Sequence, residues 1–432
     1  MNEIEVALEE LTRLGLHRST RLISGPQGPQ VLLDGRPVLL LCSNNYLGLA
    51  EHPRVREAAA DAAMRWGVGA GASRLVSGTM TIHETLEQAL AAFEGSERCV
   101  LFGSGYLANI GVIGALTSLP AGGTNGSKGR AAAGGERIVF SDARNHASIV
   151  DGCRLARART FVYKHRDVEH LAWGLREAPA GSVIVTDSVF SMDGDIAPLV
   201  EIVELAERHG ARLVVDEAHA TGTLGPGGRG AVAAAGLEGR VDVVVGTLGK
   251  ALGSYGAYAC ASSATVEYLV NSARTLIFST APPPPAIAGA LAALELLSEQ
   301  PRRVEKLQAN SALMRSALAR AGISPPDGET QIIPLIVGDA AQAVELCAAA
   351  LRRGVFAQAI RPPTVAPRSS RLRLTLMASH TASEISRAAE AIAAAARDIG
   401  TSFERETRAG GEGLAAAIGA RRLAKPAVEP TG

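Results

Sequence analysis

Residues 212–219 read RLVVDEAH, and residues 241–250 read VDVVVGTLGK. Each segment is a short apolar run, typical of a buried strand, that is followed by polar residues: Asp216 and His219 after the first run and Lys250 after the second. Parallel strands end at the same edge of a sheet, and such sheets bind their ligands at that edge. The two segments therefore predict strands of a parallel sheet that bring Asp216, His219 and Lys250 to one site.

The sequence on either side of these segments continues the same pattern. Short apolar runs alternate with helical patterns from about residue 84 to residue 260, and residues 199–209 have helical periodicity. The predicted strands are residues 99–102, 137–140, 160–163, 182–186, 212–216 and 241–246. This alternation predicts an α/β domain with a mostly parallel central sheet that is covered by helices on both faces.

The rest of the chain divides into further units. We expect an N-terminal helix and arm (1–50), a large α/β domain (51–285), a smaller C-terminal α+β domain (286–400) and a disordered tail (401–432). Ile4, Leu8 and Leu11 recur at helical spacing and predict an amphipathic docking helix. Apolar strands are predicted at 331–337 and 371–376. Residues 117–135 hold six glycines without periodicity, which predicts a flexible surface insertion in the large domain.

The composition limits the class of partner and the compartment. Lys and Arg number 43 and Asp and Glu number 43, so the formal net charge is zero, which argues against a protein that binds nucleic acid or an anionic membrane through a basic surface. The uncharged stretch 275–294 contains four consecutive prolines and cannot form a membrane-spanning helix. The five cysteines lack the spacing of a zinc site, so we expect no metal and a reduced, cytoplasmic protein.

A glycine-rich turn offers a first binding site. Residues 103–108, GSGYLA, follow a predicted strand and open a helix, and free N–H groups at a helix N-terminus bind anions, which predicts a phosphate as the ligand. The same string fits the dinucleotide fingerprint G-x-G-x-x-A, with Asp142 as the ribose-binding acid, so a nicotinamide or flavin cofactor is an alternative. A strand-to-helix turn with a purely structural role is another.

Lys250 and Asp216 indicate a different cofactor. Apolar and glycine neighbours leave Lys250 few partners, and a lysine removed from water has a lowered pKa and can form a Schiff base. A carboxylate held at a strand end, as Asp216 is, can keep a pyridine nitrogen protonated. With the phosphate-binding helix, these residues describe a site for pyridoxal 5′-phosphate (PLP), and a dinucleotide enzyme has no use for the pair.

Three strings resemble a known family: DSVFSMDGD at 187–195, VDEAH at 215–219 and GTLGK at 246–250. They are similar to the motifs of the α-oxoamine synthases, and the resemblance covers about residues 15–398, interrupted by the predicted insertion. The resemblance implies the aspartate-aminotransferase-like fold of PLP fold-type-I enzymes and a homodimer. It also implies a reaction in which an amino acid condenses with an acyl thioester and CO₂ is lost.

The resemblance implies roles for individual residues at the cofactor. Lys250, His146 and Asp216 are the expected catalytic residues: Lys250 forms the Schiff base, His146 stacks on the pyridine ring and Asp216 contacts the ring nitrogen. A strand-end histidine that caps a helix is the alternative for His146. His219 is expected to donate a hydrogen bond to the ring hydroxyl. The remaining expected contacts are the backbone N–H groups of Gly105 and Tyr106, the side chains of Ser191 and Thr247, and Thr280 of the same chain or of a partner subunit.

The resemblance also implies contacts to the amino-acid substrate. Arg373 and Asn44 match residues that bind the carboxylate of the amino acid, and a planar guanidinium suits bidentate carboxylate binding. The expected substrates are L-alanine and a pimeloyl thioester of CoA or acyl carrier protein. The expected products are 8-amino-7-oxononanoate, CO₂ and free thiol.

A proline-rich segment connects the chain to one branch of the family. Residues 361–364, RPPT, resemble the 8-amino-7-oxononanoate synthases of biotin biosynthesis, which implies that Thr364 touches the acyl substrate. The N-terminal arginine of those enzymes aligns near His17 or Arg18 here, so Arg18 or Arg21 is the candidate for binding the pimeloyl carboxylate.

Other functions stay open at this point. Within the family, a glycine C-acetyltransferase (2-amino-3-ketobutyrate CoA ligase) or another α-oxoamine synthase would share these motifs. A PLP aminotransferase would keep the aspartate and the lysine without needing a thioester, and a nicotinamide oxidoreductase would need residues 103–108 to bind a pyrophosphate. A non-catalytic partner subunit with the same fold would not need Lys250, so the lysine argues against that alternative.

Overall fold

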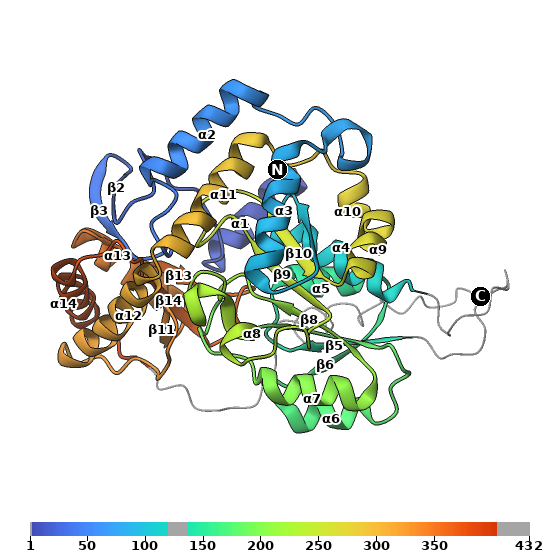
Figure 1. Cartoon of the computed structure of the whole chain (residues 1–432). Helices are drawn as coiled ribbons and strands as arrows, with labels where there is room; N and C mark the ends of the chain where they lie inside the picture. The colour runs from blue at the N-terminus through green and yellow to red at the C-terminus, as the bar shows by residue number, and fades with distance from the viewer. Residues whose placement is uncertain (1, 120–136, 404–432) are drawn as a thin grey trace, which may run out of the picture.

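The computed structural model describes residues 2–119 and 137–403, and its centre is a seven-stranded sheet (Figure 1). In spatial order the strands are β4 (Arg98–Phe102), β10 (Ala257–Ala261), β9 (Val243–Thr247), β8 (Arg212–Asp216), β7 (Val183–Asp187), β5 (Ile138–Asp142) and β6 (Arg159–Tyr163). The five strands from β9 to β6 are parallel, whereas β10 is antiparallel to both of its neighbours. This confirms the expected mostly parallel sheet. The short strand β10 was not predicted.

Helices cover both faces of the sheet, which is why its strands are apolar on both sides. In β9, Val243 and Val245 pack into one core with residues of α4, α5 and α9, while Val244 packs into the other core. The helices of the large domain are α2 (Pro53–Trp66), α3 (Thr81–Glu94), α4 (Gly105–Thr117), α5 (Ala147–Leu155), α6 (Val168–Leu175), α7 (Leu199–His209), α8 (Gly230–Ala234), α9 (Ser263–Ser272) and α10 (Arg274–Ile277). Short helical turns are present at Arg74–Gly78 and Pro226–Gly228.

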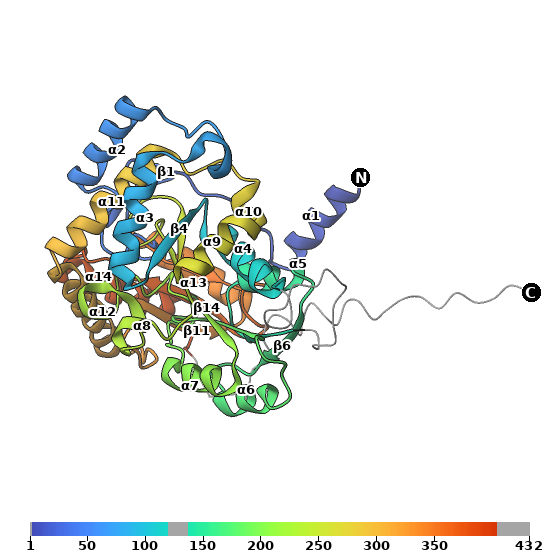
Figure 2. The ribbon, with the colours of Figure 1, turned by 45° about the vertical axis from the view of Figure 1, so that its right-hand side comes forward.

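The N-terminal segment forms a helix and an arm. Helix α1 (Glu3–Arg13) begins at the N-cap Asn2, has no buried residue and projects from the body of the molecule (Figure 2). The arm contributes β1 (Ile23–Ser24), β2 (Gln30–Leu33) and β3 (Arg36–Leu40). Strand β3 pairs in parallel with β12 (Val355–Phe356), so the arm shares a sheet with the C-terminal part of the chain.

The C-terminal part combines helices with a three-stranded antiparallel sheet. The sheet has the order β11 (Ile332–Gly338), β14 (Ser370–Thr375) and β13 (Gln358–Ile360). Helices α12 (Arg302–Arg320), α13 (Ala340–Arg352) and α14 (Ala382–Asp398) gather beside it, and α11 (Pro284–Glu299) packs against α2 and α3 (Figure 1).

Two predicted irregular segments fall mostly outside the described residues. The predicted insertion at 117–135 begins at the last residue of α4, and from residue 120 on it lies outside the described part of the chain. The predicted tail lies outside it from residue 404 on. Across the described ranges, no helix has the length and apolar character needed to cross a bilayer.

Candidate active site

Lys250 and His219 meet at the carboxyl ends of β9 and β8. The Nζ atom of Lys250 lies 3.0 Å from Nε2 of His219. Burial lowers the pKa of Lys250 to about 8, although the negative charges of Asp216 and Asp187 oppose this change. Burial also lowers the pKa of His219 well below its usual value, and the charge of Lys250 adds to the effect. The site therefore holds a neutral imidazole beside an amine that loses its proton more readily than a surface lysine.

Asp216 ends β8 and is buried, with only 4% of its surface exposed. The side-chain amide of Asn109 donates to its Oδ2 at 2.7 Å, and the backbone N–H of Ala218 donates to its Oδ1 at 2.8 Å. These two donors supply part of the hydrogen bonding that a buried carboxylate needs, and they fix its orientation. Asp216 is thus a rigidly held acceptor that can keep a heterocyclic nitrogen protonated.

His146 lies at the start of α5, and this position is compatible with both predicted roles, capping the helix and stacking on a cofactor ring. It is the N-cap of α5, and its Nδ1 accepts a hydrogen bond from the backbone N–H of Ser148 at 3.3 Å. The hydroxyl of Ser148 lies 2.7 Å from the same nitrogen and accepts from Asn109 at 2.9 Å. Because His146 is exposed, capping the helix leaves its side chain available for stacking.

Asp187 supports this arrangement from the end of β7. Its Oδ2 accepts a hydrogen bond from the backbone N–H of His146 at 2.7 Å. Burial raises the pKa of Asp187 well above its usual value, and the neighbouring charge of Asp216 adds to the increase. The loop before α5 is therefore fixed by an acidic group from a neighbouring strand.

The predicted phosphate loop lies where β4 leads into α4. Ser104 is the N-cap, and the N–H groups of Gly105 and Tyr106 belong to the first turn, where backbone donors have no intrahelical acceptor. A Cβ built on Gly105 would meet no atom within 4 Å, so the space beside the loop is open. The Tyr106 hydroxyl donates to Asp151 at 2.6 Å and leaves the backbone as the anion-binding element.

The two predicted threonines lie in different surroundings. Thr247 ends β9, where its hydroxyl donates to the carbonyl of Gly256 at 3.1 Å and accepts from the N–H of Gly249 at 3.2 Å. Thr280 is exposed and forms an isolated antiparallel bridge with Ser73. Within the part of the chain that the structure describes, no hydrogen bond joins Thr280 to Lys250.

Arg373 and Ser191 connect the C-terminal sheet to the large domain. Arg373 lies on β14, is only 7% exposed, and donates from Nε to the backbone carbonyl of Ser191 at 2.5 Å. Asn44 approaches from the arm, where its Oδ1 accepts from the Tyr46 hydroxyl at 3.0 Å. The positive charge and a side-chain hydrogen bond of Arg373 act on the same hydroxyl, so Arg373 and Asn44 both lie at Tyr46.

Thr364 and Arg18 lie at one loop. The guanidinium of Arg18 donates to the carbonyl of Pro362 at 3.3 Å, and the backbone N–H of Thr364 donates to the carbonyl of Arg361 at 3.1 Å. Arg21 instead pairs with Asp34 at 3.3 Å. Of the two N-terminal candidates, Arg18 is the one beside Thr364.

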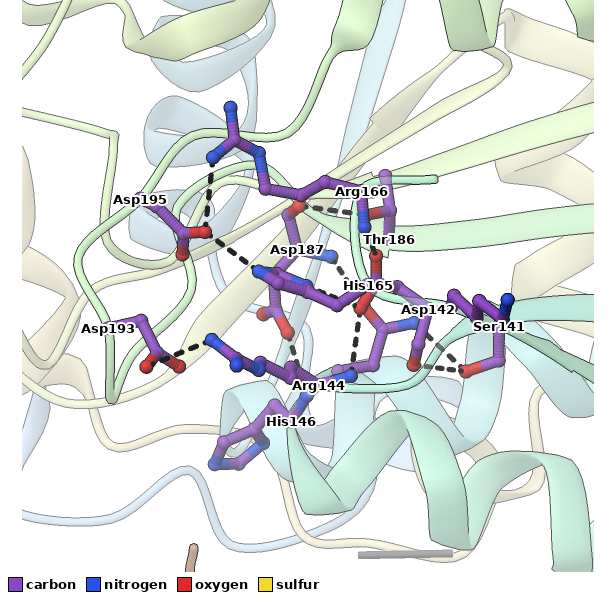
Figure 3. A network of polar contacts seen from close by, with 12 residues as sticks. Ser141, Asp142, Arg144, His146, His165, Arg166, Thr186, Asp187, Asp193 and Asp195 are labelled. Carbon is purple, nitrogen blue, oxygen red and sulfur yellow. Dashed lines mark hydrogen bonds and ion pairs between the residues drawn. The ribbon is translucent and has the colours of Figure 1, made fainter. Parts of the chain in front are cut away.

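A network of charged residues holds the loop that carries Ser191 (Figure 3). His165 lies between two carboxylates, 2.8 Å from Asp142 Oδ1 through Nδ1 and 2.7 Å from Asp195 Oδ2 through Nε2. Arg144 pairs with Asp193 of the same loop. Burial alone would lower the pKa of His165, but its bonds to Asp142 and Asp195 raise it to about 9. Asp142 is thus engaged within the protein, which leaves the dinucleotide interpretation without its ribose-binding acid.

Local sequence patterns did not point to several residues that this site uses. Asn109 and Ser148 orient Asp216 and His146, Tyr46 contacts His219, and the side-chain amide of Gln331 donates to the backbone carbonyl of His219 at 2.9 Å. Asn109 did carry a signal, because it is a buried amide in an otherwise apolar stretch of helix. The contact of Gln331 carried none, because it joins residues 112 positions apart.

The chemistry of these groups fits PLP. Lys250 offers an amine with a lowered pKa to an aldehyde, and Asp216 offers an oriented carboxylate to a pyridine nitrogen. The imidazole of His146 offers a flat surface, and the start of α4 offers backbone donors with open space beside them.

Comparisons with known proteins point the same way. The model of the family "Aminotransferase class I and II" matches residues 36–392. The chain is 49% identical over 398 residues to the 8-amino-7-oxononanoate synthase of Geotalea daltonii, covering 91% of this chain and 97% of that protein. Among solved structures, it is similar to serine palmitoyltransferase from S. paucimobilis with bound PLP–myriocin aldimine. The TM-score is 0.83 and the sequence identity is 31%, and the match covers 92% of this chain and 98% of that chain.

A second solved structure links the fold to the sequence relatives. The 8-amino-7-oxononanoate synthase from Francisella tularensis has a TM-score of 0.70 and 26% identity, covering 84% of this chain and 98% of that one. The motifs of residues 187–250, the mostly parallel sheet and these relatives agree with one another. The chain belongs to the aminotransferase class I and II family and, within it, to the α-oxoamine synthases.

Proposed function

We propose that the chain is a PLP-dependent acyltransferase that condenses L-alanine with a pimeloyl thioester to give 8-amino-7-oxononanoate, CO₂ and free thiol in biotin biosynthesis. The observation that carries the proposal is the 49% identity to an 8-amino-7-oxononanoate synthase over 97% of that relative's length. The clustering of Lys250, His219 and Asp216 at one sheet edge supports it.

The residues that would hold PLP are those at the strand and helix ends. Lys250 would bind its aldehyde, Asp216 its pyridine nitrogen and the start of α4 its phosphate, with His146 on the ring. When bound, PLP supplies an electron sink that stabilises negative charge at the Cα atom of the amino acid. Lys250, as a free amine of lowered pKa, can then take the Cα proton and return it.

The other cofactor contacts stay predictions from the family resemblance. Thr247 ends β9 at this edge of the sheet, Ser191 lies on the loop that follows β7, and His219 lies beside Lys250. The family resemblance would also let Thr280 complete the phosphate site from a second subunit; within its own chain, its backbone pairs with Ser73.

The two substrates would bind to different parts of the chain. Arg373 and Asn44 would bind the carboxylate of alanine, since both lie at the Tyr46 hydroxyl beside His219. Arg18 and Thr364 would bind the acyl group, since both lie at the loop of residues 361–364. A carboxylate at the far end of the pimeloyl chain would give Arg18 an ionic partner.

The test is a panel of amino acids against acyl thioesters. L-alanine, glycine and serine are combined with pimeloyl, acetyl and palmitoyl thioesters of CoA, and pimeloyl acyl carrier protein is added as an alternative donor. Thiol release and the product mass are followed. Alanine with the pimeloyl group should dominate. Glycine with the acetyl group would indicate a glycine C-acetyltransferase, and amino-group transfer without thiol release would indicate an aminotransferase.

We also propose that the chain acts as a homodimer in the cytoplasm. Helix α1 exposes Ile4 and Leu8, which are 71% and 46% exposed, and Val76 and Phe278 are 79% and 71% exposed. Five free cysteines are consistent with a reducing compartment. Light scattering should give twice the chain mass. Mixing inactive Lys250→Ala chains with Thr280→Ala chains should restore activity, because one site of the mixed dimer would then be intact.

A further inference from the structure

The loop that follows β7 carries a buried carboxylate that joins two parts of the chain. The side chain of Asp193 is only 6% exposed, and its Oδ1 pairs with two arginines. Arg144 lies 3.1 Å away and belongs to the loop before α5, which also carries His146 (Figure 3). Arg371 belongs to β14 of the C-terminal sheet. One carboxylate oxygen therefore lies between the cofactor side of the site and the strand that carries Arg373.

The same loop contacts β14 at a second point. Arg371 and Arg373 stand two positions apart on this strand, so their side chains lie on one face of the sheet. Arg373 donates from Nε to the carbonyl of Ser191 at 2.5 Å. Arg371 donates to the carbonyl of Met192 at 3.1 Å and to the carboxylate of Asp193. The two arginines therefore contact successive parts of one loop, and a shift of Arg371 would also move Arg373.

The ion pair of Asp193 and Arg371 is buried on both sides. The two side chains are 6% and 5% exposed, so solvent screens the pair weakly. A buried charge is costly without a partner, and the loss of one partner leaves the other uncompensated. Arg371 also donates from Nε to the carbonyl of Ser369 at 3.0 Å, which holds the guanidinium to its own strand. The position of β14 against the loop therefore depends on the charge of Asp193.

We propose that Asp193 is a positioning residue that fixes Arg373 where it binds the carboxylate of the amino-acid substrate. Asp193 acts through Arg371, on the same strand face as Arg373, and through Arg144, two residues before His146. The proposal rests on the proposed function, in which Arg373 binds that carboxylate. Without the charge of Asp193, the two guanidinium groups would lose the anion that they share, and the hold of the loop on β14 would weaken.

The experiment compares two amines that differ in the carboxylate. L-alanine carries the group that Arg373 would bind, and ethylamine is the same molecule without that group. Each is titrated into the PLP-loaded full-length chain, and the change in cofactor absorbance gives its dissociation constant. Asp193→Asn keeps the shape of the side chain and removes its charge. It should weaken alanine binding by on the order of tenfold, because Arg373 is misplaced, and leave ethylamine binding and PLP content near those of the parent chain.

Asp195→Asn is the matched control on the same loop. Asp195 pairs with His165 at 2.7 Å and with Arg166 at 3.3 Å, and both of these residues follow β6 of the seven-stranded sheet. These pairs hold the loop to the large sheet and not to β14, so the ratio of the two dissociation constants should change little. A selective loss of alanine binding as large as that in Asp193→Asn would assign the effect to the loop as a whole and overturn the proposal.

A second variant tests the same connection from β14 if Asp193→Asn does not fold. Arg371→Gln should also weaken alanine binding selectively, because residue 371 then no longer pairs with Asp193. Alanine constants within about twofold of the parent chain in the folded variants, or equal losses for both amines, would overturn the proposal. Arg373→Ala separates this failure from that of the proposed function: if that variant binds alanine as the parent does, the carboxylate-binding role of Arg373 fails instead.

Discussion

Replacing His165 with glutamine should destabilise the protein at neutral and acid pH and have little effect near about pH 9.5. His165 uses both ring nitrogens on carboxylates, 2.8 Å from Asp142 and 2.7 Å from Asp195, which requires the doubly protonated imidazolium. Its side chain is only 10% exposed, so solvent screens this interaction weakly. Glutamine keeps one amide donor but carries no charge, so the two carboxylates would lose their cation.

The size and sign of the effect follow from the pKa. The pKa of His165 is raised from 6.5 to about 9 against the burial that opposes it, and a difference of about 2.5 corresponds to about 3 kcal/mol. Because the folded state binds the proton more tightly than the unfolded state, this stabilisation is fully present below pH 6.5. It is lost progressively as the pH rises from 6.5 through about 9.

The assay is urea denaturation of the parent chain and His165→Gln across this pH range. The difference in the free energy of unfolding should be about 3 kcal/mol larger at pH 6 than at about pH 9.5. His170→Gln is the matched control, because His170 accepts from the backbone of Lys164 and packs on Phe161 and Trp173. A difference between parent and variant that stays constant with pH would refute the assignment of charge to His165.

Three further variants test the active site. Lys250→Ala should abolish the borohydride-reducible cofactor linkage and lower turnover by roughly 10³-fold or more, and normal turnover would contradict its role. Asp216→Asn should reduce turnover by on the order of 10²-fold while PLP content stays near that of the parent, because the phosphate site is untouched; equal losses of both would argue for a structural role. Arg18→Ala should raise KM for the pimeloyl thioester roughly tenfold with little change for alanine, whereas Arg21→Ala should not; the reverse result would exchange the two arginines.

Local sequence patterns were enough to predict the sheet edge that carries the chemistry. The apolar runs that end at Asp216 and precede Lys250 became β8 and β9, which are neighbours in the sheet. The same reasoning placed the glycine-rich turn between β4 and α4. It succeeded because the period of a strand and the turn at its end are properties of a few consecutive residues.

The predictions were incomplete where an element is short or carries a weak pattern. Strand β10 reads AYACA, which lacks the branched side chains typical of strands, and its antiparallel pairing with β4 and β9 decides its conformation. The strand pairing of the arm could not be predicted either, because β3 pairs in parallel with residues 355–356, more than 300 positions away.

The residue types at the ends of the strands, and hence the chemistry available to Asp216, His219 and Lys250, can be read from the local sequence. The groups that orient these residues come from distant parts of the chain and depend on how it packs: Tyr46 approaches His219 from 173 positions away, and Asn109 approaches Asp216 from 107 positions away. Such contacts depend on how separate elements pack in three dimensions. No periodicity within one segment encodes them, so the orientations of the side chains in this site are a property of the fold.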